Sequence, residues 1–173
     1  MFTNNARILI IGIFLAAGLF FSYEHVYALV AATLMFIALI IWGYFKEGTV
    51  ILAAKSFHKK DYEKTESLLS QITHPAWLSK KRRGFYEFIM GGVCLQKQDF
   101  DEAEKHYEIA AQYPLRTAND HVAALVHVAN ISIRQGNYDK ARAYLQLADK
   151  HEGKITAKMK DVISKLEEEL KQH

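Results

Sequence analysis

The sequence predicts an all-α protein in two parts, an N-terminal helical hairpin in a membrane and a stack of helix pairs behind it. Three observations support this fold class. Two long apolar runs open the chain of 173 residues, a motif then recurs three times at an interval of 38 residues, and the chain holds two prolines in all. No run alternates apolar and polar residues as a half-buried strand would. A fixed interval of this size is typical of repeat architectures.

The charge distribution divides the chain at the same place. Residues 1–45 carry one arginine (Arg7) and one acid (Glu24), whereas the other 21 Lys/Arg and 18 Asp/Glu all lie from Lys46 onward. A single cysteine, Cys94, excludes an internal disulfide, and with it the disulfide-stapled class of small secreted proteins.

Residues 1–45 are predicted to form a transmembrane helical hairpin, with spans of about 7–23 and 26–45. A spanning helix needs roughly 20 apolar residues, which the second run supplies and the first nearly does. Glu24-His25 separates the two runs and would form the turn. The apolar runs 8–23 and 26–45 contain no charged residue, which argues against an ion path or a transporter core. A cleaved signal peptide followed by one span is the alternative.

Small side chains predict how the two spans would pack. Because small residues let helices approach closely in lipid, counting outward from the turn places Gly18 near Ala31 and Ala32, and Gly12 near Ala38.

The positive residues flanking the spans predict the orientation. Positive flanks stay in the cytoplasm, so we expect a two-span protein of a bacterial cell membrane with both termini and the repeats cytoplasmic. The loop between the spans has no lysine or arginine. The flanking cations are Arg7, Lys46, Lys55, Lys59 and Lys60.

Residues 46–153 are predicted to form three repeats, about 48–77, 84–115 and 120–153, each made of two antiparallel helices. The second helix of each copy starts at an Asp or Asn, which are favourable N-cap residues, followed by an aromatic residue. Small and large side chains then recur at positions 0, +4 and +7, which form one helical face. The starts are Asp61-Tyr62, Asp99-Phe100 and Asn137-Tyr138, and the face comprises Thr65, Ala103 and Ala141, Leu69, Tyr107 and Leu145, and Ile72, Ala110 and Ala148.

These motifs resemble the tetratricopeptide repeat (TPR) family. Gly136-Asn137-Tyr138-Asp139-Lys140-Ala141 matches the start of the family's second helix, and Gly91 occupies its small position in the first helix. The first copy departs from the pattern at Thr65, and the interval is 38 residues rather than the family's 34 or so. The resemblance covers roughly Gly48 to Gly153 and implies an α-solenoid that acts as a scaffold for protein binding.

Residues 154–173 are predicted to form a capping helix. Its apolar residues fall on one side, and lysines and the Glu167-Glu168-Glu169 run cover the other. A polar outer face is what the end of a solenoid requires. The apolar side comprises Ile155, Met159, Val162, Ile163, Leu166 and Leu170.

The resemblance also implies a partner-binding groove along the first helix of each repeat. Carried over by register, its residues are mainly apolar, which suits a peptide or helix of a protein partner. Val50 and Ala54 stand where the family's carboxylate clamp has Lys and Asn, so a C-terminal carboxylate is not the expected ligand. The alternative is that the last helix, or tighter packing, covers the groove. Its residues are Phe57, Phe85, Phe88, Leu95, Val126, Asn130, Ile133 and Arg134.

A basic run lies between the first and second repeats. Four consecutive cations near a helix N-terminus oppose the helix dipole, so we expect a partner elsewhere. Anionic lipid headgroups would contribute about 1 kcal/mol per basic group, and a solvated turn is the alternative. This membrane-surface patch comprises Trp77, Lys80, Lys81, Arg82 and Arg83.

No catalytic residue, metal or cofactor is expected. The eight histidines form no HxxxH or HExxH pair, and no second cysteine could complete a zinc site. A net charge of +3 is too small to favour nucleic acid, and no small-molecule substrate is expected. The sequence therefore predicts a membrane-anchored TPR scaffold, not an enzyme, that binds a protein partner at the cytoplasmic membrane face. The alternative is an accessory subunit of an integral membrane complex that docks through its hairpin.

Overall fold

Helices make up most of the part of the chain that can be described. The computed structural model describes residues 4–172, apart from the side chains of residues 4–7, 44–47 and 152. All regular structure within residues 4–172 is helical, which confirms the all-α class. The chain divides into two units, residues 1–49 and 50–173, whereas the sequence placed the boundary after residue 45. The predicted membrane orientation depends in part on Arg7 and Lys46, and their side chains lie outside the described part of the chain.

The N-terminal unit contains two helices joined by a tight turn, α1 (Asn4–Tyr23) and the first part of α2 (Tyr27–His58). His25 has a φ of 53°, in the left-handed region. The Val26 amide donates to the Phe21 carbonyl at 2.9 Å, which satisfies one of the free carbonyls at the end of α1. The Glu24-His25 pair therefore forms the turn that the sequence predicts.

The contacts between α1 and α2 differ from the predicted ones. A Cβ added to Gly18 would lie 3.1 Å from Thr33 Oγ1, and Phe14 stacks on Phe36 with ring centroids 5.5 Å apart. A Cβ added to Gly12 would have no atom of another helix within 4 Å. Gly18 is therefore the small residue at the helix contact, and Gly12 is not.

One helix of the described chain, α2, is long and apolar enough to cross a membrane. The apolar part of α1, Ile8–Tyr23, is shorter than a typical span. Both helices expose large apolar side chains, among them Ile8, Leu19, Leu34 and Trp42.

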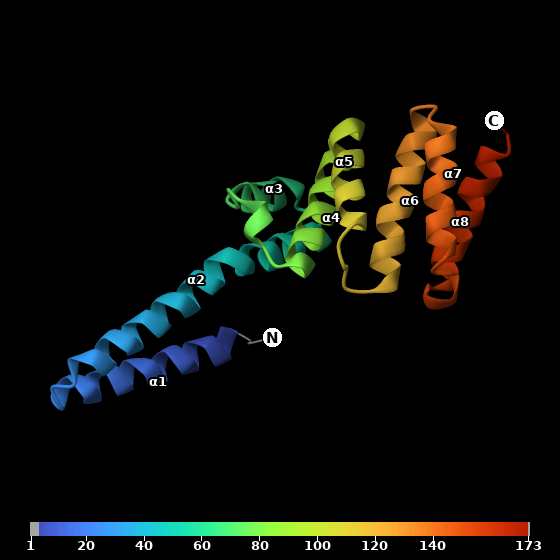
Figure 1. Ribbon diagram of the computed structural model, residues 1–173. Coiled ribbons are helices and arrows are strands. Elements are labelled where there is room, and N and C mark those ends of the chain that lie inside the picture. The colour runs from blue at the N-terminus through green and yellow to red at the C-terminus, as the bar shows by residue number, and fades with distance from the viewer. Residues whose placement is uncertain (1–3, 173) are drawn as a thin grey trace. The chain divides into compact units, whose positions relative to one another are not determined.

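The repeat array, which we define as residues 50–172, contains three helix pairs and a final helix (Figure 1). Each helix from α3 to α8 packs against the next one along the chain. Pair 1 is the end of α2 with α3 (Tyr62–Ser70), pair 2 is α4 (Lys80–Gln96) with α5 (Phe100–Ala111), and pair 3 is α6 (Ala118–Arg134) with α7 (Tyr138–Asp149). The final helix, α8 (Ala157–Leu170), is shorter than the predicted 154–173, and the short 3-10 helices η1 (Pro75–Trp77) and η2 (Glu152–Lys154) lie in the connections.

The same turn closes the first helix of every pair. Lys60, Gln98 and Gly136 have φ values of 62°, 63° and 78°, and each precedes the N-cap of the second helix. The amide of each N-cap residue donates to a carbonyl five residues back, as in a Schellman motif. Asp61 and Asp99 also accept a bond from the amide three residues on, at 3.2 Å. These bonds explain why the second helices begin at Tyr62, Phe100 and Tyr138.

Three apolar clusters form the core of the array. The first joins pair 1 to α4 around Val50, Leu69 and Ile89. The second joins α5 to α6 around Tyr107 and Val128, and the third joins pair 3 to α8. At about 25 cal/mol per Å² of buried apolar surface, these contacts between neighbours are the main source of the array's stability.

Candidate functional site

Most residues of the predicted groove pack between helices. Val126 and Ile133 are only 7% and 6% exposed, in the cluster that includes α8. Four apolar members are half-buried against the other two clusters: Phe57, Phe85, Phe88 and Leu95. The two polar members are Asn130, which is also half-buried, and Arg134, which is exposed. The open part of this surface is therefore more polar than the sequence implied.

Phe57 lies at the contact between pair 1 and pair 2. A Cβ added to Gly92 would lie 2.5 Å from Phe57 Cζ, so the ring occupies the space that a larger residue at 92 would need. The Phe57 ring also packs edge-on against Tyr62, with centroids 5.7 Å apart. Gly91, on the same helix, faces the Tyr107 ring, which explains why a small residue is needed there.

Phe88 belongs to an aromatic group between α4, α5 and α6. Its ring centroid is 5.6 Å from that of Tyr107 and 6.2 Å from that of His127. His127 stacks on Tyr107 with centroids 4.5 Å apart. Burial lowers the pKa of His127 to about 4 and raises the pKa of Tyr107 well above its ordinary value. His127 is therefore a neutral packing residue at physiological pH.

Arg134 is the charged residue of the predicted groove, and it lies beside an aromatic ring. Its guanidinium carbon is 5.8 Å from the centroid of Phe100, in a cation–π arrangement. This contact joins the end of α6 to the start of α5 and orients the guanidinium, which remains exposed. Arg134 and Asn130 are thus the members of the predicted groove best placed to meet a partner.

The basic run is divided between two environments. Lys80 and Lys81 are exposed in the first turn of α4, and Trp77 is exposed beside His74, with ring centroids 4.6 Å apart. Arg82 is half-buried. The exposed part of the predicted membrane-surface patch therefore consists of Trp77, Lys80 and Lys81.

Arg83, in contrast, forms an internal ion pair. It contacts Glu87 at 2.6 Å, and Glu87 is only 1% exposed. On the other side, His106 Nδ1 of α5 lies 2.5 Å from the same carboxylate. A buried carboxylate requires such partners, because leaving it unpaired is costly. The Arg83–Glu87–His106 group therefore ties α4 to α5, which gives one cation of the run a structural role.

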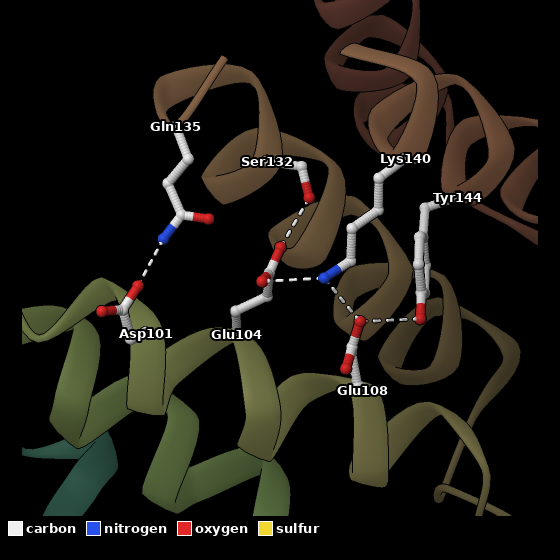
Figure 2. A network of polar contacts seen from close by, with 7 residues as sticks. All are labelled: Asp101, Glu104, Glu108, Ser132, Gln135, Lys140 and Tyr144. Carbon is white, nitrogen blue, oxygen red and sulfur yellow. Dashed lines mark hydrogen bonds and ion pairs between the residues drawn. The ribbon is translucent and has the colours of Figure 1, made fainter. Parts of the chain in front are cut away.

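A second polar network ties α5 to pair 3 (Figure 2). Lys140 Nζ lies 2.8 Å from Glu104 and 2.8 Å from Glu108. Ser132 donates to Glu104 at 2.6 Å, and Tyr144 donates to Glu108 at 3.2 Å. Burial opposes the charge on Lys140, but the bonds to the two glutamates outweigh it and raise the pKa of Lys140.

At the end of this network, Gln135 donates to Asp101 at 2.8 Å (Figure 2). The pairing between α3 and α4 is simpler, with Lys97 Nζ lying 2.6 Å from Glu66. Acidic residues of a second helix thus meet donors of the next pair at both junctions.

Comparison with known proteins assigns the array to a family. A family model described as the SusR N-terminal TPR domain matches residues 40–163, which is more than half of the chain. The chain belongs to this family. The TPR match begins within α2 and ends within α8. Searches of curated proteins and of solved structures give no match.

The TPR assignment agrees with the kind of site that the array presents. Arrays of this type use extended surfaces to bind other proteins. Within the described residues, no group of three or more His, Cys, Asp or Glu side chains could hold a metal ion. Burial and nearby acids raise the pKa of the Cys94 thiol, which is the opposite of what a nucleophile needs.

The polar residues of the TPR domain were the part that sequence reasoning missed. Glu87, Glu104, Glu108 and Lys140 were not singled out, although Arg83 and Glu87, and likewise Glu104 and Glu108, are four residues apart on one helical face. That spacing was the available signal. No sequence signal identified their partners in other helices, such as His106 for Glu87.

Proposed function

We propose that this protein is a membrane-anchored TPR scaffold that binds a protein partner at the cytoplasmic membrane face. The observation that carries the proposal is the contrast between a TPR array with its own core and an N-terminal helix that exposes apolar side chains over a membrane-spanning length. A scaffold of this kind acts by recognition and by raising the local concentration of its partner at the bilayer.

The exposed part of the membrane-surface patch, Trp77, Lys80 and Lys81, supports a location of the array close to the bilayer. Leu78, the residue after Trp77, packs in the same cluster as Val50, where the array begins. Val50 follows the apolar part of α2 by a few residues, so these residues belong to the end of the array that comes directly after the anchor in the sequence. Lys80 and Lys81 are there to meet anionic headgroups.

Membrane attachment and orientation are tested first. The full chain should remain in the membrane pellet after an alkaline carbonate wash. In a Cys94→Ser background, Lys154→Cys should resist a membrane-impermeant thiol reagent in intact cells and react after permeabilisation. Extraction by carbonate would refute the anchor, and labelling in intact cells would refute the orientation.

Partner binding is tested by photocrosslinking in native membranes. A photoreactive residue at Asn130 or at Arg134 should give the same discrete protein adduct. Leu147, exposed on α7, is the matched control position and should not give it. An adduct pattern that is the same at all three positions would refute this surface as the partner site.

One observation favours a second candidate, an accessory subunit that docks into an integral membrane complex through its N-terminal helices. A Cβ added to Gly12 would meet no atom within 4 Å, and Ala16, Ala31 and Ala38 are exposed, so these small residues are accessible to a further helix. Replacing Gly12 and Ala16 with Leu should then abolish assembly with other membrane proteins, whereas a scaffold would keep its partner.

A further inference from the structure

The first helix of the array exposes a face that the corresponding helices bury. Ile51 and Leu52, near the end of α2, are 37% and 45% exposed. One or two intervals of 38 later the exposure is lower: Ile89, which corresponds to Ile51, is 1% exposed, Val128, which corresponds to Leu52, is 0% exposed, and the other two equivalents, His127 and Met90, are half-buried. The same position in the fold is thus more exposed at the start of the array than within it.

Within the array, the second helix of the preceding pair covers this face. Leu69 of α3 packs in the same cluster as Ile89 of α4. Tyr107 of α5 packs in the same cluster as Val128 of α6 and stacks on His127. Pair 1 has no preceding pair among residues 50–172, so no helix of the array covers the equivalent face of α2. We call each contact between a second helix and the next pair a junction: two junctions, α3 on α4 and α5 on α6, are occupied, and this one is not.

The other end of the array is finished differently. α8 packs its apolar side on pair 3 and exposes polar residues on its outer side. A polar outer side is what the end of a helical repeat array requires. The exposed residues of α8 include Lys158, Asp161, Lys165 and Glu168.

Charge at the vacant face indicates what could occupy it. Lys97 pairs with Glu66 of the preceding helix, and the residue one interval before Lys97 is Lys59. Lys140 pairs with Glu104 and Glu108, and the residue two intervals before Lys140 is Lys64. These two lysines are exposed at positions where, within the array, cations meet the carboxylates of a covering helix.

We propose that this face, which we call the open junction (Ile51, Leu52, Lys55, Lys59 and Lys64), binds an acidic amphipathic helix of a partner protein, seated as α5 is seated on α6. Helix α1 carries no acidic residue and does not supply the complementary charge. Lys55 stands where the occupied junctions have apolar residues, so the bound helix should present a carboxylate there too. The open junction is separate from the surface around Asn130 and Arg134, so this proposal does not depend on the partner site proposed there.

The chain's own α5 provides the probe, because it already occupies an equivalent junction. A fluorescent, helix-stabilised peptide of residues 99–112 is titrated with the full chain in phosphatidylcholine nanodiscs, and binding is followed by anisotropy. Saturable binding is expected. Lys59→Glu combined with Lys64→Glu should weaken it about tenfold, because two attractive pairs become repulsive. A peptide carrying Glu104→Lys and Glu108→Lys should regain affinity for that variant.

Matched controls separate the open junction from the rest of the surface. Leu52→Ser should weaken peptide binding, and Leu147→Ser, at a leucine of similar exposure (41%), should not. Lys154→Glu combined with Lys158→Glu makes the same charge change on exposed residues at the opposite end and should leave binding unchanged. Circular dichroism confirms that each variant is folded.

The bilayer surface is the competing occupant, and a second measurement detects it. Cys94→Ser is a suitable background, because Ser56 and Ser132 hold the equivalent positions. A bimane label at Leu52→Cys is then tested for quenching by nitroxide lipids, in nanodiscs with and without phosphatidylglycerol. Lipid quenching without saturable peptide binding would overturn the proposal in favour of the membrane. No peptide binding, or binding unaffected by the charge reversals, would also overturn it.

Discussion

The N-terminal unit and the repeat array use similar apolar side chains in opposite ways. In the array, nearly all of the buried apolar residues belong to three clusters. In the N-terminal unit, residues such as Ile8, Leu19 and Leu34 are more than half exposed. Soluble proteins rarely leave large contiguous apolar surfaces in water. The array is stabilised by its own packing, whereas α1 and the start of α2 leave their apolar side chains exposed, and this difference is the basis for proposing an anchor there.

The most severe way to break this comparison is to place a charge in each region. Leu69→Arg puts a cation into a fully buried site of the array and should reduce the free energy of unfolding by about 4 kcal/mol or more. Leu34→Arg, at an exposed site of α2, should leave the unfolding of the array unchanged and weaken membrane insertion by about 3 kcal/mol. Urea unfolding in micelles and carbonate extraction measure the two effects. Equal loss of array stability in both variants would contradict the comparison.

Acid should act on the array through His127. Its pKa in the folded protein is lowered to about 4 by burial, so the stability it contributes is present above its unfolded value near 6.5 and is lost as the pH falls from there through 4. The wild-type free energy of unfolding should therefore fall by about 3 kcal/mol relative to His127→Phe once the pH is below 4. Parallel pH profiles for the two proteins would show that His127 is not buried as a neutral group.

The Arg83–Glu87–His106 group should be more sensitive than an exposed pair. Glu87→Ala leaves Arg83 and His106 without their shared carboxylate and should cost about 2 kcal/mol, less than the loss of a partner in a fully buried pair, because Arg83 and His106 are 19% and 21% exposed. Glu102→Ala, which breaks an exposed pair with Lys105, is the matched control and should change stability very little. Chemical unfolding at pH 7 measures both. A similar cost in the two variants would contradict the structural role of Glu87.

The mildest test compares two glycines. Gly92→Ala should reduce the stability of the array by about 1 kcal/mol, since the crowding against Phe57 outweighs the gain in helix propensity. Gly12→Ala, at a position where the added Cβ would have no atom within 4 Å, should leave the array unchanged. Thermal unfolding followed by circular dichroism would resolve the difference. Stabilisation by Gly92→Ala would show that Phe57 can move aside.

The sequence was sufficient for the helices and not for all of their contacts. Local signals, such as the N-caps Asp61 and Asp99, predicted where the second helices begin, because a cap acts within one turn. The starts of the first helices were less sharply predicted: the second repeat was placed at about 84–115, and its first helix, α4, begins at Lys80. For the N-terminal unit, composition predicted a second span, whereas the partner of Gly18 depended on the rotation of two helices.

The candidate site was predicted less well, for a geometric reason. Register placed Phe88 and Val126 on the inner face of the first helices, but the width of that face depends on how closely neighbouring pairs pack. Phe88 instead contacts Tyr107 and His127, and Val126 packs in the cluster with α8. Bonds such as Ser132 to Glu104 join residues 28 positions apart, and a periodic pattern alone does not specify which donors and acceptors will meet.

The unequal bracing of the two junctions has a consequence for how the array opens. Lys140, Ser132 and Tyr144 hold α5 against pair 3, whereas Glu66 and Lys97 hold α3 against α4. Local opening costs less free energy where fewer side chains bridge the gap. The amides of α3 should therefore exchange with deuterium sooner than those of α6. Local opening of pair 1 would also let the array adjust its shape at the end where we propose that a partner helix binds.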